Sequence, residues 1–548
     1  MLERFARWWV KAEDGPSAPQ RTPLGLVASL AAICIAVAFV GVPRLRVYGH
    51  DVFVSLDGGW RVLHGQRPAV DFFAQMGPAY YLLHAAGLRV AGYAARGLGY
   101  GTTFVAVVIS TWSFFLLRRR MTASVFVLAS IALVLLAVAP FPLGSGPWNT
   151  SFAMKHNRYE FAITGLLFLE CFLPSSQDDT GKKQFAGGFS SGLACALLLF
   201  LKISYGLVAV GLLAVSAIFR PRERMRVAGI CAGLACFTIP MLAYLRFDVR
   251  ALLREYRLLA AVRAGGLGVS SIVLRWYQDR FEVSLLALLA VLVSLLPGVS
   301  ARRRIELPVA TALAVGAGTL LLLTNTQPSM YPLNTAMALI LINEVASLRH
   351  AVAPLVAAPL LGMGALIVAI PLCLDASGLV LAAGDKLLRP DAAAAGGYRL
   401  EGSHLAALEF FEDRGLSESS SRDDNGRPFV EITNEGFALL RDNTVPAESV
   451  RGMGLGNPFS YGLLRPPSRG GSVVIGVTDV SRSAVPPLDL LVGNADLLLF
   501  PKFPDSDREP LRIIVDRYPE LLGSLYSQVA ESEHWKLYRR VRVDGVRN

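Results

Sequence analysis

Long apolar segments follow one another from about residue 23 to residue 374, separated by short polar or basic stretches. A helix needs about 20 mostly apolar residues to cross the hydrocarbon core of a bilayer, and about 17 still suffice. By this measure the sequence predicts an α-helical polytopic membrane protein with about eleven spans. They lie near residues 23–43, 98–117, 122–140, 159–174, 184–201, 203–219, 227–245, 283–297, 306–324, 333–348 and 353–374.

Two apolar segments need separate interpretation. The segment 78–95 is interrupted by His84 and Arg89, so we expect a helix that lies at the membrane interface and does not cross. The run 24–42 is too long for the core of a signal peptide, so we expect it to be retained as the first span.

Basic clusters between the spans predict the orientation. If segment 78–95 does not cross, four clusters fall on one side of the membrane, and positive clusters in short loops mark the cytoplasmic side. They are residues 118–120, 182–183, 220–226 and 302–304. We therefore expect a cytoplasmic tail at residues 1–22, an external loop at 44–97, and a carboxyl-terminal region on the external side of the membrane.

The sequence changes character after residue 374. Residues 375–428 are rich in polar and small residues and are expected to form a linker, whereas 429–548 show short apolar runs separated by turns. Strands are predicted at 472–477, 495–500, 526–530 and 535–538, and a helix at 511–522. This pattern predicts a small soluble α/β domain.

Composition narrows the class of protein further. The chain has 548 residues, of which 53% are hydrophobic, and a net charge of +11 that is concentrated between the apolar segments, which argues against a nucleic-acid-binding face. No glycine-rich phosphate loop follows a strand, and the seven histidines form no zinc-binding pattern. We therefore expect neither a nucleotide nor a built-in zinc ion.

The loop after the first span carries the most informative motif. An acid, Asp51, opens it, a short amphipathic helix around Trp60 follows, and then come Gly65-x-x-Pro68, Asp71-Phe72-Phe73 and Pro78 with two tyrosines. This order resembles the first external loop of the GT-C glycosyltransferases, specifically the group of bacterial protein mannosyltransferases and aminoarabinose transferases. The resemblance departs from the family pattern at Val52, where a second acid is common, and at Gly77-Pro78, where Pro-Pro is usual.

The resemblance implies that Asp51 is the catalytic residue. An acid at this place can accept the proton of an attacking hydroxyl. The alternative interpretation is that Asp51 only caps the helix that begins at Val52. Asp71 is implied as a substrate-binding residue, and the alternative for it is a turn-forming aspartate.

Helical spacing predicts how the loop helix is placed. One apolar face should lie on the bilayer; it comprises Phe53, Leu56, Trp60 and Leu63. Asp57 and Arg61 stand four residues apart on another face, which favours a solvated ion pair.

A second charged motif, from Lys155 to Glu160, stands where the chain enters a later span. Glu160 is the second catalytic candidate, because related enzymes often carry an acid there. Two carboxylates would repel a lipid phosphate unless cations offset them, and Lys155, Arg158 and a divalent metal ion could do so. The alternative is that the motif anchors the helix at the headgroups.

A third basic group follows residue 245. Arg246, Arg250, Arg254 and Arg257 recur at helical spacing along one stripe, where guanidinium groups suit phosphate. The stripe and Lys202 predict a binding site for a polyprenyl phosphate; the alternative partner is ordinary anionic lipid.

Together these features predict a membrane glycosyltransferase that moves a sugar from a polyprenyl-phosphate donor to a glycan, lipid or protein acceptor. Two rivals remain: a lipid or sugar transporter, and a non-catalytic membrane subunit of a glycan-assembly complex. Transporters usually place polar residues and broken helices deep in paired spans. The mid-span regions here are mostly Ala, Val, Leu and Gly, which does not favour the transporter.

Overall fold

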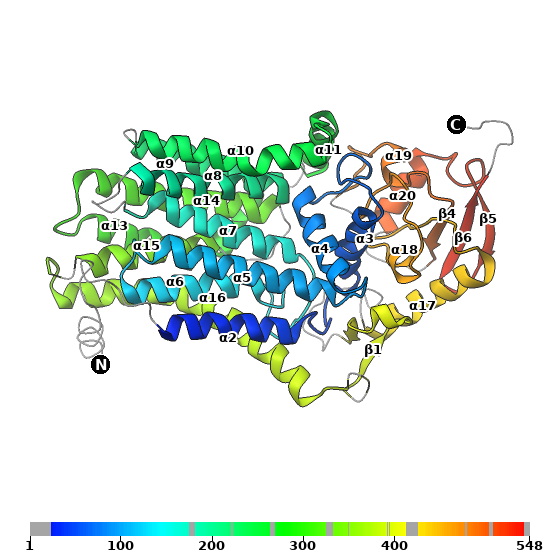
Figure 1. Cartoon of the computed structure of the whole chain (residues 1–548), viewed down its shortest axis with the longest axis horizontal. Helices are drawn as coiled ribbons and strands as arrows, with labels where there is room; N and C mark the ends of the chain where they lie inside the picture. Colours follow the sequence, from blue (N-terminus) through cyan, green and yellow to red (C-terminus); the bar gives the residue numbers. More distant parts are fainter. Residues whose placement is uncertain are drawn as a thin grey trace.

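The computed structural model describes residues 24–541 except 175–180, 221–222, 264–268, 325–331, 349, 392, 394, 413–425, 477–478 and 503–507, so the expected tail 1–22 lies outside it. Long helices run side by side along the longest axis and form a body, with the carboxyl-terminal domain at one end (Figure 1). Each expected span corresponds to one helix. These are α2 (Leu24–Val40), α5 (Gly97–Leu117), α6 (Ala123–Val138), α7 (Lys155–Phe172), α8 (Gly181–Leu201), α9 (Ile203–Phe219), α10 (Arg224–Tyr244), α13 (Arg280–Ser294), α14 (Ala301–Thr324), α15 (Pro332–Ser347) and α16 (Pro354–Leu388).

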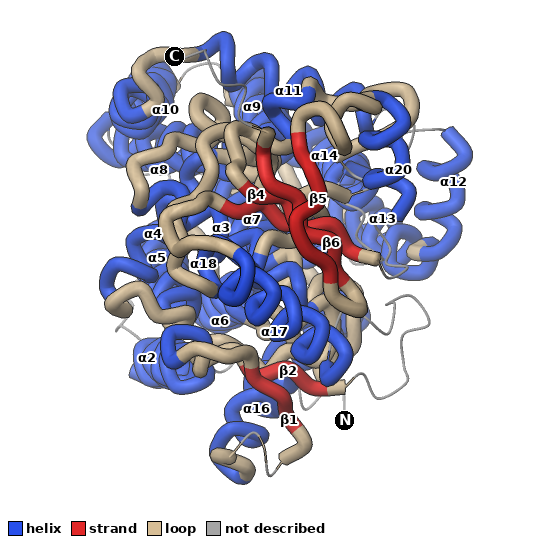
Figure 2. Tube along the Cα trace, turned by 90° about the vertical axis from the view of Figure 1, so that its right-hand side faces the viewer, coloured by secondary structure: helices blue, strands red, loops and turns tan. Residues whose placement is uncertain are grey.

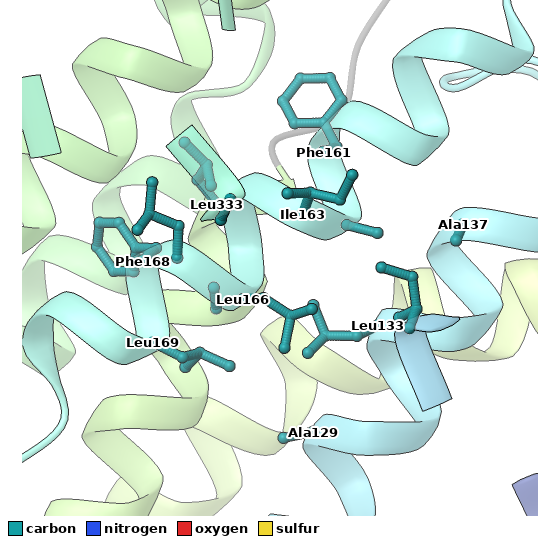
Figure 3. Packing of buried hydrophobic residues seen from close by; sticks show 14 of the residues in the cluster. Ala129, Leu133, Ala137, Phe161, Ile163, Leu166, Phe168, Leu169 and Leu333 are labelled. Atoms are coloured by element: carbon teal, nitrogen blue, oxygen red, sulfur yellow. The ribbon is translucent and has the colours of Figure 1, made fainter. Parts of the chain in front are cut away.

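The apolar helices make this a multi-pass membrane protein. Five described helices, α5, α8, α10, α14 and α16, have the length and composition to cross a membrane alone, and α2, α6 and α9 are shorter but apolar. Every residue of α7 is buried. Apolar side chains of α6 and α15 close around it, as Figure 3 shows for Leu133, Phe168 and Leu333. The central helix α7 is therefore shielded by its neighbours, so it can carry polar residues away from lipid.

Helices α8 and α10 approach each other closely. Gly188 and Gly192 on α8 face α10, and Gly229 and Gly233 on α10 face α8. A Cβ atom added at any of the four would collide with a backbone carbonyl of the opposite helix. Small residues at such contacts let two helix backbones meet within a membrane.

Short helices separate the body from the carboxyl-terminal domain (Figure 1). They are α3 (Val52–Leu63), which follows the 3-10 turn η1 (Gly49–Asp51), and α4 (Pro78–Val90). With 13 residues, α4 is about 20 Å long and too short to cross a bilayer. Helix α11 (Val249–Arg263), followed by α12 (Val269–Gln278), is seen end-on in Figure 1, so its axis runs across the spans.

The segment 375–428 contains regular structure, so the expectation of a linker is wrong for its described part. Helix α16 continues to Leu388, and strands β1 (Gly397–Arg399) and β2 (Glu409–Phe411) form an antiparallel pair, with the turn η3 (Ser403–Leu405) between them. Asp385 pairs with Arg46 at 3.0 Å and with Arg44 at 3.2 Å. These contacts hold the polar end of α16, which lies beyond the expected span, against the start of the first loop.

The carboxyl-terminal domain is built on a four-stranded sheet that crosses the end of the molecule (Figure 2). Its order is β3-β4-β6-β5, with β3 parallel to β4 and the other pairs antiparallel. The strands are β3 (Val450–Gly452), β4 (Leu497–Pro501), β5 (Tyr526–Glu531) and β6 (Trp535–Arg540); the helices are α17 (Gly426–Asn443), α18 (Pro458–Gly462), α19 (Leu488–Leu491) and α20 (Arg508–Arg517). Three predicted strands and the α/β class are therefore confirmed.

The strand predicted at 472–477 is wrong, because this segment pairs with the first loop instead of the sheet. Phe73 N–H donates to Gly471 O at 3.0 Å, and Val473 N–H donates to Phe73 O at 3.1 Å. The Gln75 amide also donates to Ser472 Oγ at 2.9 Å. The carboxyl-terminal domain thus lies on the same side of the body as the first loop.

Candidate active site

Helix α7 divides its charged residues between two faces. On one face, Lys155 Nζ donates to the carbonyls of Val138 and Ala139 at 2.8 Å each. Arg158 pairs with Asp375 of α16 at 2.9 Å, and both side chains are almost completely buried. These two cations satisfy carbonyls at the end of α6 and tie it to α16. They are therefore committed to helix packing, in contrast to the expected phosphate-binding role.

The opposite face of α7 carries His156, Asn157 and Glu160, one helical turn apart. Lys202, at the break between α8 and α9, places its Nζ 3.2 Å from His156 Nε2 and 3.3 Å from Asn157 Oδ1. Lys202 is 5% exposed and Glu160 is not exposed at all. This cluster brings together two of the expected site residues, Lys202 and Glu160, inside the body.

Tyr80 of α4 connects this cluster to the first loop. Its hydroxyl lies 2.6 Å from Ser55 Oγ on α3, and its ring lies 5.5 Å from that of His156. Burial raises the pKa of the Tyr80 hydroxyl well above its usual value; the Ser55 hydrogen bond lowers it, and the carboxylates of Glu160 and Asp51 add to the rise. Tyr80 is therefore a neutral phenol that both candidate acids influence.

Asp51 stands at the edge of the buried cluster. It ends the turn η1, its carboxylate lies 3.1 Å from His50 Nε2, and its side chain is 19% exposed. It makes no side-chain hydrogen bond to the amino-terminal turn of α3. The interpretation of Asp51 as a helix cap is therefore not supported, and its carboxylate remains accessible.

Asp57 and Arg61 form the expected ion pair at 2.9 Å, but both are fully buried, so the expectation of a solvated pair is wrong. The second Asp57 oxygen accepts from Asn457 Nδ2 at 3.1 Å. Arg61 also donates to the carbonyls of Ser468 and Gly470. These contacts cross from α3 to the carboxyl-terminal domain, so the pair joins the two.

The apolar face of α3 also differs from its expected place. Phe53, Leu56 and Trp60 pack in a buried cluster with residues of the carboxyl-terminal domain, and Trp60 Nε1 donates to Arg465 O at 2.8 Å. An amphipathic pattern shows that a helix has an apolar partner. It does not distinguish lipid from a protein domain, which is why the bilayer-facing prediction was wrong.

A third buried charge lies in the same region. Arg451 of β3 has no exposed surface, and its guanidinium makes no hydrogen bond within the described residues. Burial lowers the pKa of Arg451 to about 9, and the negative charge of Asp57 opposes that decrease. Asp57 is therefore the counter-charge for two buried guanidinium groups.

Asp71 lies outside the cluster and closes a turn with Arg67. Its Oδ2 accepts from Arg67 Nε at 2.7 Å and from Arg67 N–H at 2.8 Å. Burial would raise the pKa of the Asp71 carboxyl, but the Arg67 hydrogen bonds outweigh burial and lower it. The structure thus matches the turn-forming interpretation of Asp71.

The arginine stripe is also separate from the cluster. Arg250, Arg254 and Arg257 are exposed on α11, and no described contact joins them to Asp51 or Glu160. Glu255 of the same helix points inward, where its Oε2 accepts from Ala74 N–H at 2.9 Å.

An apolar cavity of about 590 Å³ is lined by Tyr159 and Leu201, the residues that precede Glu160 and Lys202 in the sequence. Helices α4, α5, α7, α8 and α10 line it almost entirely with apolar atoms, among them Ala79, Tyr159, Leu201 and Met241. Such a cavity can accept a hydrocarbon chain. Among the described residues, no three His, Cys, Asp or Glu side chains are grouped to hold the divalent metal ion considered above.

Sequence reasoning did not find Ser55, Tyr80 and Asp375 as parts of these clusters. Asp375 could have been found from the sequence, because an acid within an apolar helix requires a partner. Tyr80 stood in the Pro-aromatic part of the loop motif, but its position against His156 depends on how α4 folds over α7.

Comparisons with known proteins complete the description. No protein-family model matches the sequence, and no curated protein matches it. Among solved structures, the chain is similar to ArnT from Cupriavidus metallidurans bound to undecaprenyl phosphate, with 12% identity, a TM-score of 0.42, and coverage of 95% of this chain and 99% of that one. The apo form of the same protein matches with 13% identity and the same TM-score and coverage. Both matches concern the fold alone.

Proposed function

We propose that the protein is a membrane glycosyltransferase that moves a sugar from a polyprenyl-phosphate donor to a hydroxyl of a glycan, lipid or protein. The observation that carries this proposal is the pairing of two different environments. A buried polar cluster with Lys202 and Glu160 adjoins the accessible acid Asp51, and an apolar cavity opens beside it. A lipid phosphate linked to a sugar needs both environments at once.

The residues suggest a direct displacement. Asp51 accepts the proton of the acceptor hydroxyl as its oxygen bonds to the anomeric carbon. The bond from that carbon to the phosphate oxygen breaks, and its electron pair leaves with the polyprenyl phosphate. The Lys202 ammonium stabilises the charge that grows on the departing phosphate. Glu160 serves as an auxiliary acid whose negative charge acts on the Tyr80 hydroxyl.

The apolar cavity suits the hydrocarbon tail of the donor. Its volume of about 590 Å³ holds only part of a long polyprenyl chain, and the exposed side chains Phe104 and Val90 on its rim face the surrounding lipid. The remaining tail would therefore continue into the bilayer. In this proposal the reaction takes place at the outer face of the bacterial inner membrane, where the first loop and the carboxyl-terminal domain lie.

The experiment uses purified protein in proteoliposomes with a panel of undecaprenyl-phosphate monosaccharides and membrane extract as the acceptor source. Mass spectrometry measures the free undecaprenyl phosphate that is released. We expect one donor to be consumed, and Lys202→Gln to lower the rate by about 100-fold. The matched control is Lys182→Gln, which removes an exposed charge at the other end of α8.

Binding of undecaprenyl phosphate by the wild type without consumption of any donor would reject the enzyme. It would support the non-catalytic subunit of a glycan-assembly complex instead.

A further inference from the structure

Helix α11 presents three different sectors around its axis. The sector that faces the protein is buried and includes Leu252, Glu255 and Leu259. A second sector is apolar but exposed, with Val249 at 41% and Leu253 at 47%. The third sector holds the exposed arginines Arg250, Arg254 and Arg257, and the exposed Arg246 lies in the turn that precedes the helix. A helix that only covered the protein would need one apolar sector, so the second one requires another partner.

The position of α11 identifies the surroundings of the two exposed sectors. The helix follows α10 after a short turn at residues 245–248, so it begins where a span ends. In Figure 1 it lies at the outer margin of the molecule, level with the boundary between the helical body and the carboxyl-terminal domain. Its axis runs across the spans in that view. A helix with this position and orientation lies in the plane of the membrane surface.

Contacts on the inner side hold α11 in this orientation. Glu255 accepts from the backbone of Ala74 in the first loop, and Tyr256 donates to Leu199 O at the end of α8. Leu259 packs with Phe73 and with Leu490 of the carboxyl-terminal domain. The protein therefore fixes the rotation of the helix, and the arginines cannot turn inward without breaking these contacts.

The arginines of this sector make no ion pair within the described part of the chain. Among the described residues, no ion pair joins Arg250, Arg254 or Arg257 to a carboxylate, although other exposed arginines such as Arg427 and Arg441 have acidic partners. Positive charges beside an apolar sector match a bilayer surface, where phosphates lie next to acyl chains. Guanidinium groups donate paired hydrogen bonds to phosphate oxygens.

We propose that α11 is an interfacial helix whose arginine sector binds the phosphate headgroups of anionic phospholipids in the outer leaflet. Val249 and Leu253 enter the upper acyl region, and the three arginines reach the headgroups beside them. The site is independent of the transfer reaction. It would anchor the first loop and the carboxyl-terminal domain against the membrane surface through Glu255 and Leu259.

The test measures lipid selectivity of the full-length protein. The protein is reconstituted into nanodiscs that contain phosphatidylglycerol and phosphatidylcholine in equal amounts, and the lipids that remain bound after mild detergent extraction are measured by native mass spectrometry. Each basic side chain near an anionic surface contributes about fivefold in affinity. We therefore expect the triple variant Arg250→Gln, Arg254→Gln, Arg257→Gln to lose most of the phosphatidylglycerol enrichment, by about 100-fold in relative affinity.

Two further variants separate position and chemistry from net charge. A control triple variant removes three exposed arginines of the carboxyl-terminal domain, Arg482, Arg512 and Arg517, with the same change in charge. It should keep the enrichment. Replacement of the three α11 arginines by Lys should retain most of it, because the charge persists while the paired hydrogen bonds are lost.

Absence of phosphatidylglycerol enrichment in the wild type, or equal enrichment in the α11 triple variant, would overturn the proposal. Titration of undecaprenyl phosphate into the same nanodiscs gives the remaining outcome. If the α11 variant loses affinity for undecaprenyl phosphate but keeps the enrichment, the stripe belongs to the donor site and the proposal is again rejected. None of these measurements requires sugar transfer, so the result stands apart from that of the transferase assay.

Discussion

The two acids of helix α3 and its preceding turn occupy contrasting regions. Both oxygens of Asp57 are hydrogen-bonded, by Arg61 and Asn457, and the side chain is fully buried. The carboxylate of Asp51 contacts His50, remains partly exposed, and makes no hydrogen bond to the helix it precedes. A buried carboxylate with both oxygens hydrogen-bonded holds the structure together, whereas an accessible carboxylate beside a buried polar cluster is available for chemistry.

The contrast also explains how the two regions depend on each other. The contacts of Asp57 fix α3 against the carboxyl-terminal domain, and Asp51 lies at the amino-terminal end of that same helix. The buried contacts of Asp57 therefore determine where the accessible carboxylate of Asp51 is placed. Four substitutions of acids test this division, and we describe them from the largest expected effect to the smallest.

Asp51→Asn should reduce sugar transfer by about 100-fold or more, because an amide cannot accept the proton of the attacking hydroxyl. Since Asp51 forms no cap, the melting temperature in detergent should remain unchanged. Transfer and thermal unfolding are measured on the same preparation. Asp516→Asn, which alters an exposed acid on α20, serves as the control. Full activity in Asp51→Asn would show that the Asp51 carboxylate takes no part in the reaction.

Asp57→Asn should destabilise the protein by about 3–5 kcal/mol, because Arg61 and Arg451 would lose their buried counter-charge. The measurement is thermal unfolding followed by tryptophan fluorescence. The double variant Asp57→Leu/Arg61→Met removes one charge of each sign and should recover only the part of the stability that Arg61 accounts for, because Arg451 still lacks its counter-charge. If Asp57→Asn melts at the same temperature as the wild type, the Asp57–Arg61 ion pair behaves as a pair that water solvates, and the prediction is wrong.

The surroundings of Glu255 are intermediate between those of Asp57 and Asp51, because Glu255 is buried like Asp57 but accepts only one described hydrogen bond. Burial raises the pKa of its carboxyl to about 8, while the Ala74 N–H and the charge of Arg254 oppose that rise. Between the ordinary pKa and about pH 8 the folded state binds more protons than the unfolded state, so stability should fall as pH rises through this window. Glu255→Gln should remove that slope. Melting temperatures from pH 5 to pH 9 test it, and parallel curves for the two proteins would contradict it.

Asp71→Asn should have the smallest effect, below about 1 kcal/mol, because its pair with Arg67 is partly exposed. Sugar transfer should stay near the wild-type rate, since Asp71 has no described contact with the cluster around Lys202. Transfer measured side by side with Asp51→Asn checks this. A loss of activity comparable to that of Asp51→Asn would show that Asp71 binds substrate after all.

Periodicity and length predicted most of the architecture. Each expected span corresponds to a helix, and the strands around Leu498, Gln528 and Leu537 were found where short apolar runs between turns indicated them. Failures arose where a segment finds its partner far away in the sequence. The strand expected at 472–477 instead pairs with Phe73, which no local pattern could reveal.

The candidate site rests on residue types that the sequence indicated, but its contacts were less predictable. The loop motif indicated Asp51, and the motif at the start of α7 indicated Glu160. However, helical position alone could not show that Lys155 and Arg158 turn toward α6 and α16 while Glu160 faces the other way. Whether a cation binds a ligand or a neighbouring carbonyl depends on the packing of three helices, and no sequence spacing encodes that packing.

The glycine contact between α8 and α10 has a mechanical consequence for the apolar cavity. Leu197 and Leu201 of α8 and Phe237 and Met241 of α10 form part of its wall, a few turns along from Gly192 and Gly233. The two helix backbones are in contact at these glycines, so their separation there influences the width of the cavity farther along the same helices. A single methyl group at Gly192 would push the two helices apart there. It would reshape the cavity without altering any residue that lines it.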